Sequence, residues 1–377
     1  MQERSIARKA GRVVLIACSV IMIGILALLG FLLIISPGKP MPLRGADGAV
    51  LPGSISEKIV VDINGVEQGM FIRTKNENNP VLLLIHGGPG MPEFFLVGKY
   101  PTGFEDVFTV CYWEQRGAGV SFDPKASADA LTSEQLIDDT IAVTDYLRAR
   151  FHQDKVYLMA HSGGSYVGIK AAERAPERYA AYIGVAQVAN QRESERRGYS
   201  YTLEQFEAQG NEKMVQKLKA YDVLTDDAAL DVYSRALIRD IAMHQLGIGT
   251  MHDMDSIFTG VFFPVFGSRA YTLGEKFNIW RGKALSQSRM RDFVNSRVMI
   301  DEVPALDIPT YFFSGKYDYT VNYALAKDYL HAIKAPVKGF YTFENSAHSP
   351  TYEEPERTME ILRTDVLNQR ADLADVD

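Results

Sequence analysis

Two kinds of hydrophobic pattern divide the chain. The first is a single apolar run, Val13–Ile35, of 23 residues without a charge. A helix of this length rises about 1.5 Å per residue and covers roughly 34 Å, enough to cross a hydrocarbon core of about 30 Å. The second kind begins near residue 57, where short apolar segments alternate with polar stretches that have helical spacing. The pattern predicts a membrane-spanning helix ahead of a large globular unit.

Charge next to the apolar run predicts its orientation. Four basic residues and one acidic residue precede the run. Positively charged flanks stay in the cytoplasm. We therefore expect residues 1–12 to be cytoplasmic, residues 13–35 to span the membrane once, and everything after Ser36 to lie outside the cytoplasm.

Two other interpretations of this segment are weaker than an uncleaved anchor. A cleavable signal peptide has an apolar region of about 7–15 residues that ends at small side chains, whereas this run is longer and ends in a Pro- and Gly-containing segment. Leu15–Cys18 resembles a lipoprotein cleavage box, but most of the apolar run follows it. A buried core helix of this length normally keeps one polar face, which this run lacks.

The strand pattern of the globular unit predicts a parallel sheet. A Pro- and Gly-rich linker covers residues 36–56, and Asn64-Gly65 then lies between two strand-like segments, as in a β-hairpin. Strands that are apolar on both faces are typical of a parallel sheet covered by helices. We expect such strands at Val81–Ile85, Phe108–Trp113, Val156–Ala160, Tyr182–Val188, Thr310–Ser314 and Gly339–Phe343.

Helical signals separate these strands. Thr132–Gln135 forms a capping box, and a second helix should run from residue 163 to 175 and end before a proline. Between residues 190 and 300 the strand signals disappear and helical spacing dominates. This order predicts a doubly wound, mostly parallel α/β domain whose two core parts, 57–189 and 301–377, enclose an inserted helical cap.

Composition excludes several functions. Lys and Arg total 40 against 47 Asp and Glu, a net charge of −7, so we expect no nucleic-acid partner. Two cysteines, Cys18 and Cys111, make neither a disulfide framework nor a zinc cluster. No histidines and carboxylates have metal-ligand spacing, and we therefore expect no metal and no cofactor.

The segment Ala160–Gly164 predicts a nucleophilic serine at Ser162. A serine on a sharp turn from strand to helix needs small residues two positions away on both sides, because the two backbones pass close together. Gly164 meets this requirement, whereas Ala160 departs from the usual glycine. A glycine-containing loop without chemistry is the alternative for the motif alone. The predicted strand before it and helix after it favour the nucleophile.

A second glycine-rich segment follows the strand that ends at Ile85. It reads His86-Gly87-Gly88-Pro-Gly, and glycines there let backbone N–H groups face a ligand. The N–H of Gly163, together with that of Gly87 or Gly88, would form an oxyanion hole whose donors each lower the barrier by about 3 kcal/mol. The alternative is a tight structural turn. We expect His86 to be structural and not a base.

A serine becomes a good nucleophile when a histidine takes its proton and a carboxylate orients that histidine. In this class of sheet the acid and then the histidine follow later strands. Asp318 and His348 are the two positions that fit, and with Ser162 they make the predicted triad. We expect four other histidines, which lie in polar or helical settings, to be solvated or structural: His152, His244, His252 and His331.

These motifs resemble the proline-iminopeptidase-like branch of the α/β-hydrolase superfamily, serine peptidase family S33, over roughly residues 56–365. The most specific match is His86–Gly90, which is HGGPG in that branch. Glu114–Ser121 resembles its DQRGxGxS signature, with Glu where Asp is commoner. The resemblance places the nucleophile, acid and base on the three triad positions and gives Arg116 a structural role.

The resemblance implies an aminopeptidase that holds the free amine of its substrate with glutamates. Tyr319 stands directly after the triad acid, where some relatives have one of these glutamates. Among the cap acids we expect Glu195 to contact the amine; a solvated helix face is the alternative for most of them. The cap acids considered are Glu193, Glu195, Glu204 and Glu207.

An aromatic group in the cap has two interpretations. It could wall an apolar pocket, or it could pack a helix against the sheet, and the spacing favours packing. Its members are Phe258, Phe262, Phe263, Phe266, Tyr271, Phe277 and Trp280.

The sequence as a whole predicts a membrane-anchored serine hydrolase with an acyl-enzyme mechanism. We expect it to release N-terminal residues, proline first, from short peptides or related small molecules. A carboxylesterase or amidase for small apolar esters is one alternative. A non-catalytic binding protein with a hydrolase fold is another, since Ala160 could mark a decayed site. Epoxide hydrolases and dehalogenases attack with an aspartate, so Ser162 argues against both.

Overall fold

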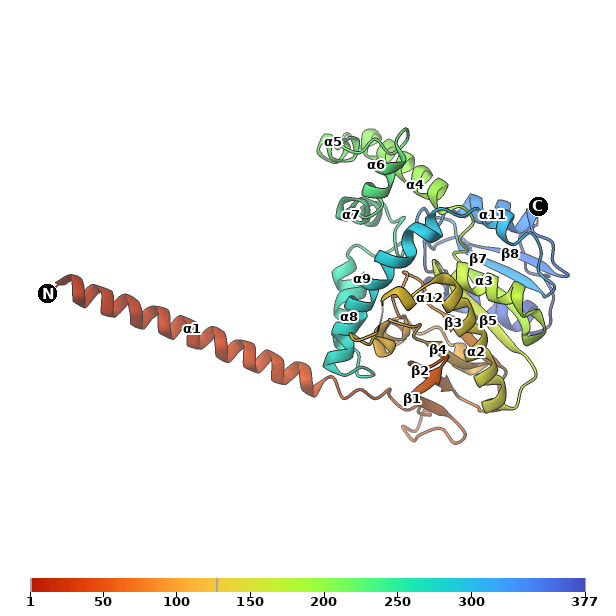
Figure 1. The fold of residues 1–377 in the computed structure, drawn as a ribbon, viewed down its shortest axis with the longest axis horizontal. Coiled ribbons are helices and arrows are strands. Elements are labelled where there is room, and N and C mark those ends of the chain that lie inside the picture. Colours follow the sequence, from red (N-terminus) through yellow and green to blue (C-terminus); the bar gives the residue numbers. More distant parts are fainter. Residues whose placement is uncertain (1, 127, 377) are drawn as a thin grey trace.

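The computed structural model describes residues 2–126 and 128–376, and it describes the side chains outside 2–10 and 291–295. Figure 1 shows a sheet with helices on both faces, a helical cap, and one long helix that projects from the domain. That helix, α1, covers Gln2–Ile34. Within the described chain, its part Gly11–Ile34 is the one helix long and apolar enough to cross a membrane, with a mean hydropathy of 2.9.

Eight strands form one sheet in the order β1-β2-β4-β3-β5-β6-β7-β8. The β1–β2 and β2–β4 pairs are antiparallel, and all pairs from β4 to β8 are parallel. This confirms the mostly parallel sheet. The strands are β1 Ile55–Ile63, β2 Val66–Thr74, β3 Val81–Ile85, β4 Thr109–Trp113, β5 Val156–His161, β6 Tyr179–Val185, β7 Thr310–Gly315 and β8 Lys338–Phe343.

Helices on the two faces of the sheet complete the core. Every residue of β3 and β4 is buried, as expected for strands covered on both sides. The side chain of Thr132 accepts a hydrogen bond from the backbone N–H of Gln135 and begins α2, as the capping box predicts. The core helices are α2 Ser133–Phe151, α3 Gly164–Arg174, α11 Tyr323–Ala332, α12 Pro350–Glu353 and α13 Pro355–Ile361.

The cap lies between β6 and β7 and is helical, as its sequence predicts. It contributes a third apolar cluster, separate from the two that flank the sheet. Figure 1 shows α8 and α9 on the side of the domain from which α1 departs. The cap helices are α4 Gln191–Ala208, α5 Glu212–Lys219, α6 Asp227–Tyr233, α7 Leu237–Gln245, the π-helical turn η6 Phe258–Phe262, α8 Phe263–Gly267, α9 Leu273–Asn295 and α10 Met299–Glu302.

One strand and the linker after α1 differ from the prediction. The strand expected at 182–188 is β6 at 179–185, because the chain turns at Ala186, which has a φ of 47°. The linker after α1 is not a free tether. Pro37 pairs with Thr272 of the cap, and the buried Lys276 ammonium donates to Ser36 Oγ at 2.7 Å.

Candidate active site

The turn between β5 and α3 presents Ser162 in a strained conformation. Its φ is 52°, a value that non-glycine residues rarely adopt. The Ser162 N–H donates to the Val185 carbonyl at 2.9 Å and ties the turn to β6. A Cβ at Gly164 would lie 2.3 Å from the His86 carbonyl oxygen. This turn therefore requires a glycine at 164, as the sequence predicts.

Ala160, the departure from the usual small-residue pattern, is accommodated by a second glycine. A Cβ at Gly168 of α3 would lie 2.5 Å from the Cβ of Ala160. The helix thus supplies the space that the alanine methyl group occupies. The turn keeps its shape, and Ala160 gives no structural sign of a decayed site.

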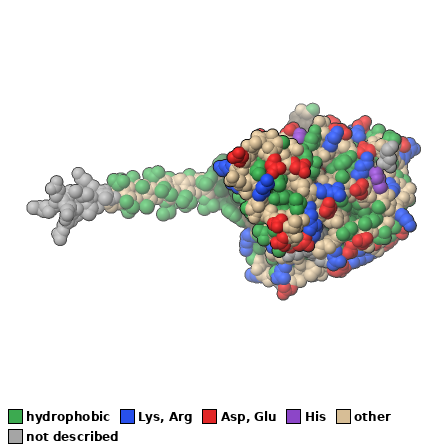
Figure 2. Space-filling view, turned by 90° about the horizontal axis from the view of Figure 1, so that it is seen from above, with side chains coloured by type: hydrophobic (Ala, Val, Ile, Leu, Met, Phe, Trp, Pro, Cys, Tyr) green, Lys and Arg blue, Asp and Glu red, His purple; other side chains and the backbone are tan. Residues whose placement is uncertain are grey.

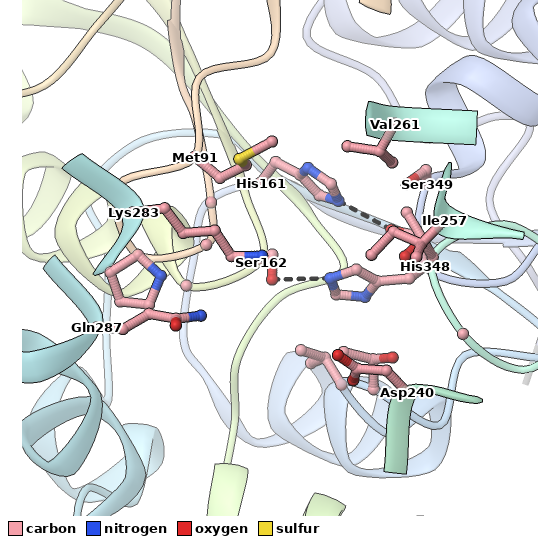
Figure 3. A pocket seen from close by; sticks show the side chains of 18 of the residues that line it. Met91, His161, Ser162, Asp240, Ile257, Val261, Lys283, Gln287, His348 and Ser349 are labelled. Carbon is pink, nitrogen blue, oxygen red and sulfur yellow. Dashed lines mark hydrogen bonds between the residues drawn. The ribbon is translucent and has the colours of Figure 1, made fainter. Parts of the chain in front are cut away.

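The structure brings the three predicted triad residues together, although they are far apart in the chain. His348 Nε2 lies 2.7 Å from Ser162 Oγ, and His348 Nδ1 lies 2.9 Å from Asp318 Oδ2. The buried Asp318 carboxylate accepts bonds from two further backbone N–H groups, of Thr320 and Val321, both at 2.9 Å. A carboxylate only accepts, so His348 Nδ1 carries the proton and Nε2 is left to accept from the serine. Figure 3 shows the Ser162–His348 bond facing the pocket.

Of the three glycines predicted for the oxyanion hole, Gly87 has its backbone N–H bonded to a side chain. The Gly87 N–H donates to Glu93 Oε1 at 3.1 Å, so it is not available as a second donor. Gly87 is required for another reason, since a Cβ there would lie 2.8 Å from the Cβ of Ser162. None of the described backbone–backbone or side-chain bonds uses the N–H of Gly88 or Gly163, and a Cβ at Gly163 would lie 3.8 Å from the Gly88 nitrogen.

His86 has the structural role that the sequence suggests. Its Nε2 accepts from the Gln115 N–H at 3.1 Å, and its Nδ1 lies 3.0 Å from the Gly87 carbonyl oxygen. Burial lowers the pKa of His86 below its ordinary value. The neutral ring holds the glycine-rich loop against the loop after β4.

A buried pair beside the triad, Glu93 and His161, was missed by the sequence analysis. His161 Nδ1 lies 2.8 Å from Glu93 Oε1, and Nε2 lies 2.8 Å from the His348 carbonyl oxygen. Both partners are acceptors, so the ring satisfies both only as an imidazolium. Burial alone would lower the pKa of His161, but the Glu93 charge and hydrogen bond raise it to about 8. The position of His161 directly before the serine was the available signal.

Glu353 holds the loop that carries His348, and this role was also missed. Its Oε1 accepts from the N–H groups of Ala347 and Ser349, at 3.0 and 3.1 Å, on both sides of the histidine. Its Oε2 accepts from the His252 N–H of the cap at 2.5 Å. Burial raises the pKa of Glu353 to about 7 in spite of these three donors. One carboxylate thus joins the histidine loop to the cap.

The cap closes a pocket of about 340 Å³ over the triad. Polar cap residues reach into it from α7 (Asp240) and from α9 (Lys283 and Gln287), and Ile257 and Val261 form an apolar wall. Figure 3 shows Lys283 directed toward Ser162, and it shows Asp240 among the residues that line the pocket. None of the seven aromatic residues singled out in the cap lines this pocket among the described residues.

Glu195, the predicted amine contact, lines the pocket but has another partner. Arg239 donates to both of its carboxylate oxygens, at 2.7 and 2.8 Å, and both side chains are buried. The negative charge of Glu195 is thus already paired with the guanidinium of Arg239 and is not free to pair with a substrate amine. Asp240, which lines the same pocket with a side chain 47% exposed, is the better-placed acid, although its Oδ1 also lies 3.0 Å from Arg239 Nη1.

The second signature is structural. Arg116 donates to both oxygens of the buried Asp139, at 2.7 and 2.9 Å, which agrees with the role predicted for Arg116. Glu114 accepts from the Tyr271 hydroxyl and from the Val120 N–H. Burial raises the pKa of Glu114 to about 8 against these two hydrogen bonds. Tyr271 is therefore not part of a pocket wall. It is a buried side chain whose hydroxyl binds Glu114.

Comparison with known proteins agrees with this arrangement. Residues 80–355 match the family described as alpha/beta hydrolase fold. The chain is 30% identical over 297 residues to the probable aminopeptidase YbaC of Bacillus subtilis (strain 168), covering 78% of this chain and 91% of that protein. It is 25% identical over 305 residues to a proline iminopeptidase of Saccharolobus solfataricus, covering 77% and 86%.

Solved structures show the same fold. The crystal structure of a proline iminopeptidase-related protein from Thermus thermophilus superposes with a TM-score of 0.56 at 18% identity, covering 83% of this chain and 98% of that one. The α/β-hydrolase fold with a mostly parallel sheet is the one expected from the sequence. The chain belongs to the α/β-hydrolase family, in its proline-iminopeptidase-like branch.

Proposed function

We propose that the protein is a membrane-anchored serine hydrolase that forms an acyl-enzyme. The observation that carries this proposal is the continuous chain of hydrogen bonds from Asp318 through His348 to Ser162, at 2.9 and 2.7 Å. The carboxylate is fully buried and the serine faces a pocket. This is the arrangement that serine acyl transfer requires.

The proposed reaction begins when Ser162 Oγ attacks a substrate carbonyl carbon and His348 Nε2 takes the hydroxyl proton. The N–H groups of Gly88 and Gly163 stabilise the oxyanion. As the tetrahedral intermediate collapses, His348 returns its proton to the leaving amine or alcohol, and the acyl group stays on the serine. Water, deprotonated by His348, then releases the acyl group. Asp318 keeps the ring oriented and stabilises the imidazolium in both halves of the reaction.

We favour an aminopeptidase with short peptides as substrates. Support comes from the aminopeptidase and proline iminopeptidase names of the two curated relatives, and from the acidic side chains of Glu195 and Asp240 at the cap side of the pocket. Asp240 is the proposed contact for the free amine, because its side chain is 47% exposed and only its Oδ1 pairs with Arg239, whereas both carboxylate oxygens of the buried Glu195 are bound by that guanidinium. We expect the N-terminal residue of the substrate, proline first, to occupy the pocket.

An esterase or amidase is the second candidate. The observation that favours it is the same Glu195–Arg239 pair, which leaves the pocket without a strong excess of negative charge. A panel of substrates separates the aminopeptidase from the esterase or amidase. It contains prolyl and alanyl arylamides with a free amine, the same arylamides with a blocked amine, and p-nitrophenyl esters. The proposal predicts a kcat/KM at least tenfold higher for free-amine substrates. Equal rates for blocked and free substrates would overturn the aminopeptidase assignment.

The membrane anchor is proposed from α1. None of its apolar window is buried inside the domain. The orientation expected from the flanking charge puts the catalytic domain outside the cytoplasm. Protease added to spheroplasts, whose cytoplasmic membrane is intact, should then digest the catalytic domain. Digestion only after that membrane is opened would refute this orientation.

A further inference from the structure

An exposed aromatic surface lies on the cap, outside the active site. We define the aromatic face as Phe258 of η6, Phe263 of α8 and Phe277 of α9, whose exposed fractions are 60%, 60% and 52%. Large apolar patches of this kind mark interaction sites for other proteins or for membranes. The active site makes no use of these three side chains.

The three exposed rings belong to one connected cluster. Phe262 is its centre, with ring centroids 5.7 Å from Phe263 and 5.5 Å from Trp280. Phe262 also lies 6.1 Å from Phe258. Phe277 joins the cluster through Phe266, whose ring centroid is 5.0 Å from that of Phe262 and 5.6 Å from that of Phe277. The exposed rings are thus supported from behind by partly buried aromatic side chains, which hold them in place at the surface.

The aromatic face lies next to the exit of α1. The chain leaves α1 at Ser36, whose Oγ accepts from the Lys276 ammonium at 2.7 Å, one residue before Phe277. Lys39 then donates its backbone N–H to the Arg269 carbonyl at 3.1 Å. Figure 1 shows α8 and α9 where α1 meets the domain, and Figure 2 shows hydrophobic side chains along α1 up to that junction.

We propose that the aromatic face docks onto the bilayer surface beside the anchor. This inference rests on the proposed membrane span of α1. A helix that ends at Ile34 brings Phe263 and Phe277 to the level of the lipid headgroups, where aromatic side chains are favoured. Two exposed cations of the same junction, Lys39 and Arg269, suit lipid phosphates, as on other interfacial helices. The occupant is the lipid surface, not a second protein.

Docking would connect the bilayer to the active site. Ile257 and Val261 lie on the same segment as Phe258, but they line the pocket (Figure 3). One side of this segment therefore faces the triad while the other faces the membrane. Docking would therefore hold the segment that forms this wall of the pocket against the bilayer.

Tryptophan fluorescence tests the proposal directly, because the chain has two tryptophans. Trp113 is buried in the core with 1% exposure, whereas Trp280 belongs to the aromatic cluster. The full chain is reconstituted into phosphatidylcholine vesicles with and without brominated acyl chains, which quench tryptophan at short range. We expect brominated lipid to remove most of the Trp280 emission, and to leave the emission of the Trp280→Phe variant unchanged.

Paired variants separate docking from folding and from anchoring. Phe258→Ser/Phe263→Ser should still float with the vesicles but lose the quenching. Leu224→Ser/Val232→Ser, which removes side chains of similar exposure (52% and 60%) elsewhere on the cap, should keep it. Wild-type protein that floats without quenching of Trp280 would overturn the proposal and leave the anchor standing. Protein that does not float would refute the anchor and the docking with it.

Discussion

His161 and His348 are joined by a hydrogen bond from the Nε2–H of the first ring to the backbone carbonyl of the second, at 2.8 Å. The first ring directly precedes Ser162 in the chain, and the second accepts the proton of Ser162 in the proposed reaction. Glu93 holds the other nitrogen of His161 and also the Gly87 N–H. A single charged pair therefore connects the serine turn, the glycine-rich loop and the histidine loop.

This connection predicts an alkaline limit to activity. The pKa of His161 is raised to about 8, so the imidazolium is present below that pH and is lost above it. A neutral ring can donate only one of the two bonds. We expect kcat to fall above about pH 8 in the wild type. His161→Gln, which does not titrate, should lose this limb and should be about 10–100-fold slower at pH 7, equivalent to a charged hydrogen bond of about 1.5–3 kcal/mol.

The measurement is kcat from pH 6 to 10 for both proteins with one p-nitrophenyl ester. A matched control is His331→Gln, which changes a histidine of α11 outside the site and should keep the wild-type profile. An unchanged alkaline limb in His161→Gln would show that another group controls it.

The contact between Ala160 and Gly168 predicts a compensating pair of substitutions. Gly168→Ala alone places two methyl groups 2.5 Å apart, and overpacking of this kind costs about 1–3 kcal/mol. Ala160→Gly/Gly168→Ala removes this contact, leaves the new methyl group 3.2 Å from Tyr182 Cε2, and adds helix propensity of about 1 kcal/mol to α3. Urea unfolding should therefore show a destabilised single variant and a double variant close to the wild type. Additive losses in the double variant would contradict this packing.

Glu114 predicts a pH dependence of stability. Its folded-state pKa is raised to about 8 from an ordinary 4.5, so its contribution to stability is fully present below pH 4.5 and is lost as the pH rises through 8. The loss is on the order of 3 kcal/mol between pH 4.5 and 7. In Glu114→Gln the amide can accept from the Val120 N–H and donate to Tyr271 Oη. We expect the variant to gain stability relative to the wild type as the pH rises.

The free energy of unfolding at pH 5, 7 and 8.5 tests this expectation. The control is Glu177→Gln, whose side chain is 65% exposed and whose curve should run parallel to the wild type. Parallel curves for Glu114→Gln as well would mean that the buried carboxylate keeps an ordinary pKa.

Two cap acids should respond differently to substitution. Asp240→Asn should raise the KM of free-amine substrates about tenfold, the effect of losing roughly 1.4 kcal/mol of binding, with blocked substrates unaffected. Glu195→Gln breaks the buried pair with Arg239, and a broken buried pair costs about 3–5 kcal/mol of stability. Steady-state kinetics and thermal unfolding separate the two. A selective rise in KM for Glu195→Gln at unchanged stability would restore it as the amine contact.

Much of the fold follows from local pattern. Continuous apolar runs predict β3, β4 and β5 almost to the residue, because strands buried on both faces leave no polar positions. The hairpin at Asn64-Gly65 follows from the positive φ of both residues, 50° and 78°. The triad positions could be chosen from chain order, since Ser162, Asp318 and His348 each follow a parallel strand.

Other features depend on contacts that local pattern does not encode. Glu93 and His161 are 68 positions apart, and although His161 directly precedes the serine, its sequence context does not identify Glu93 as its partner. The sequence alone gives Glu195 the pattern of a surface acid of α4, and only the packing of α7 shows that it is paired with Arg239. The sequence did not distinguish the exposed aromatic face from a helix packed in the core, because aromatic residues have the same spacing in both. Only the position of α1 beside these residues indicates a membrane contact.

The most direct measurement of serine catalysis is active-site labelling of the full chain with a fluorophosphonate probe, followed by mass spectrometry of the peptide that carries the label. The triad geometry predicts one label on Ser162, no label on a folded Ser162→Ala variant, and loss of hydrolysis in step with labelling. Folded wild-type protein that hydrolyses substrate without reacting at Ser162, or that neither reacts nor hydrolyses, would contradict the proposed mechanism.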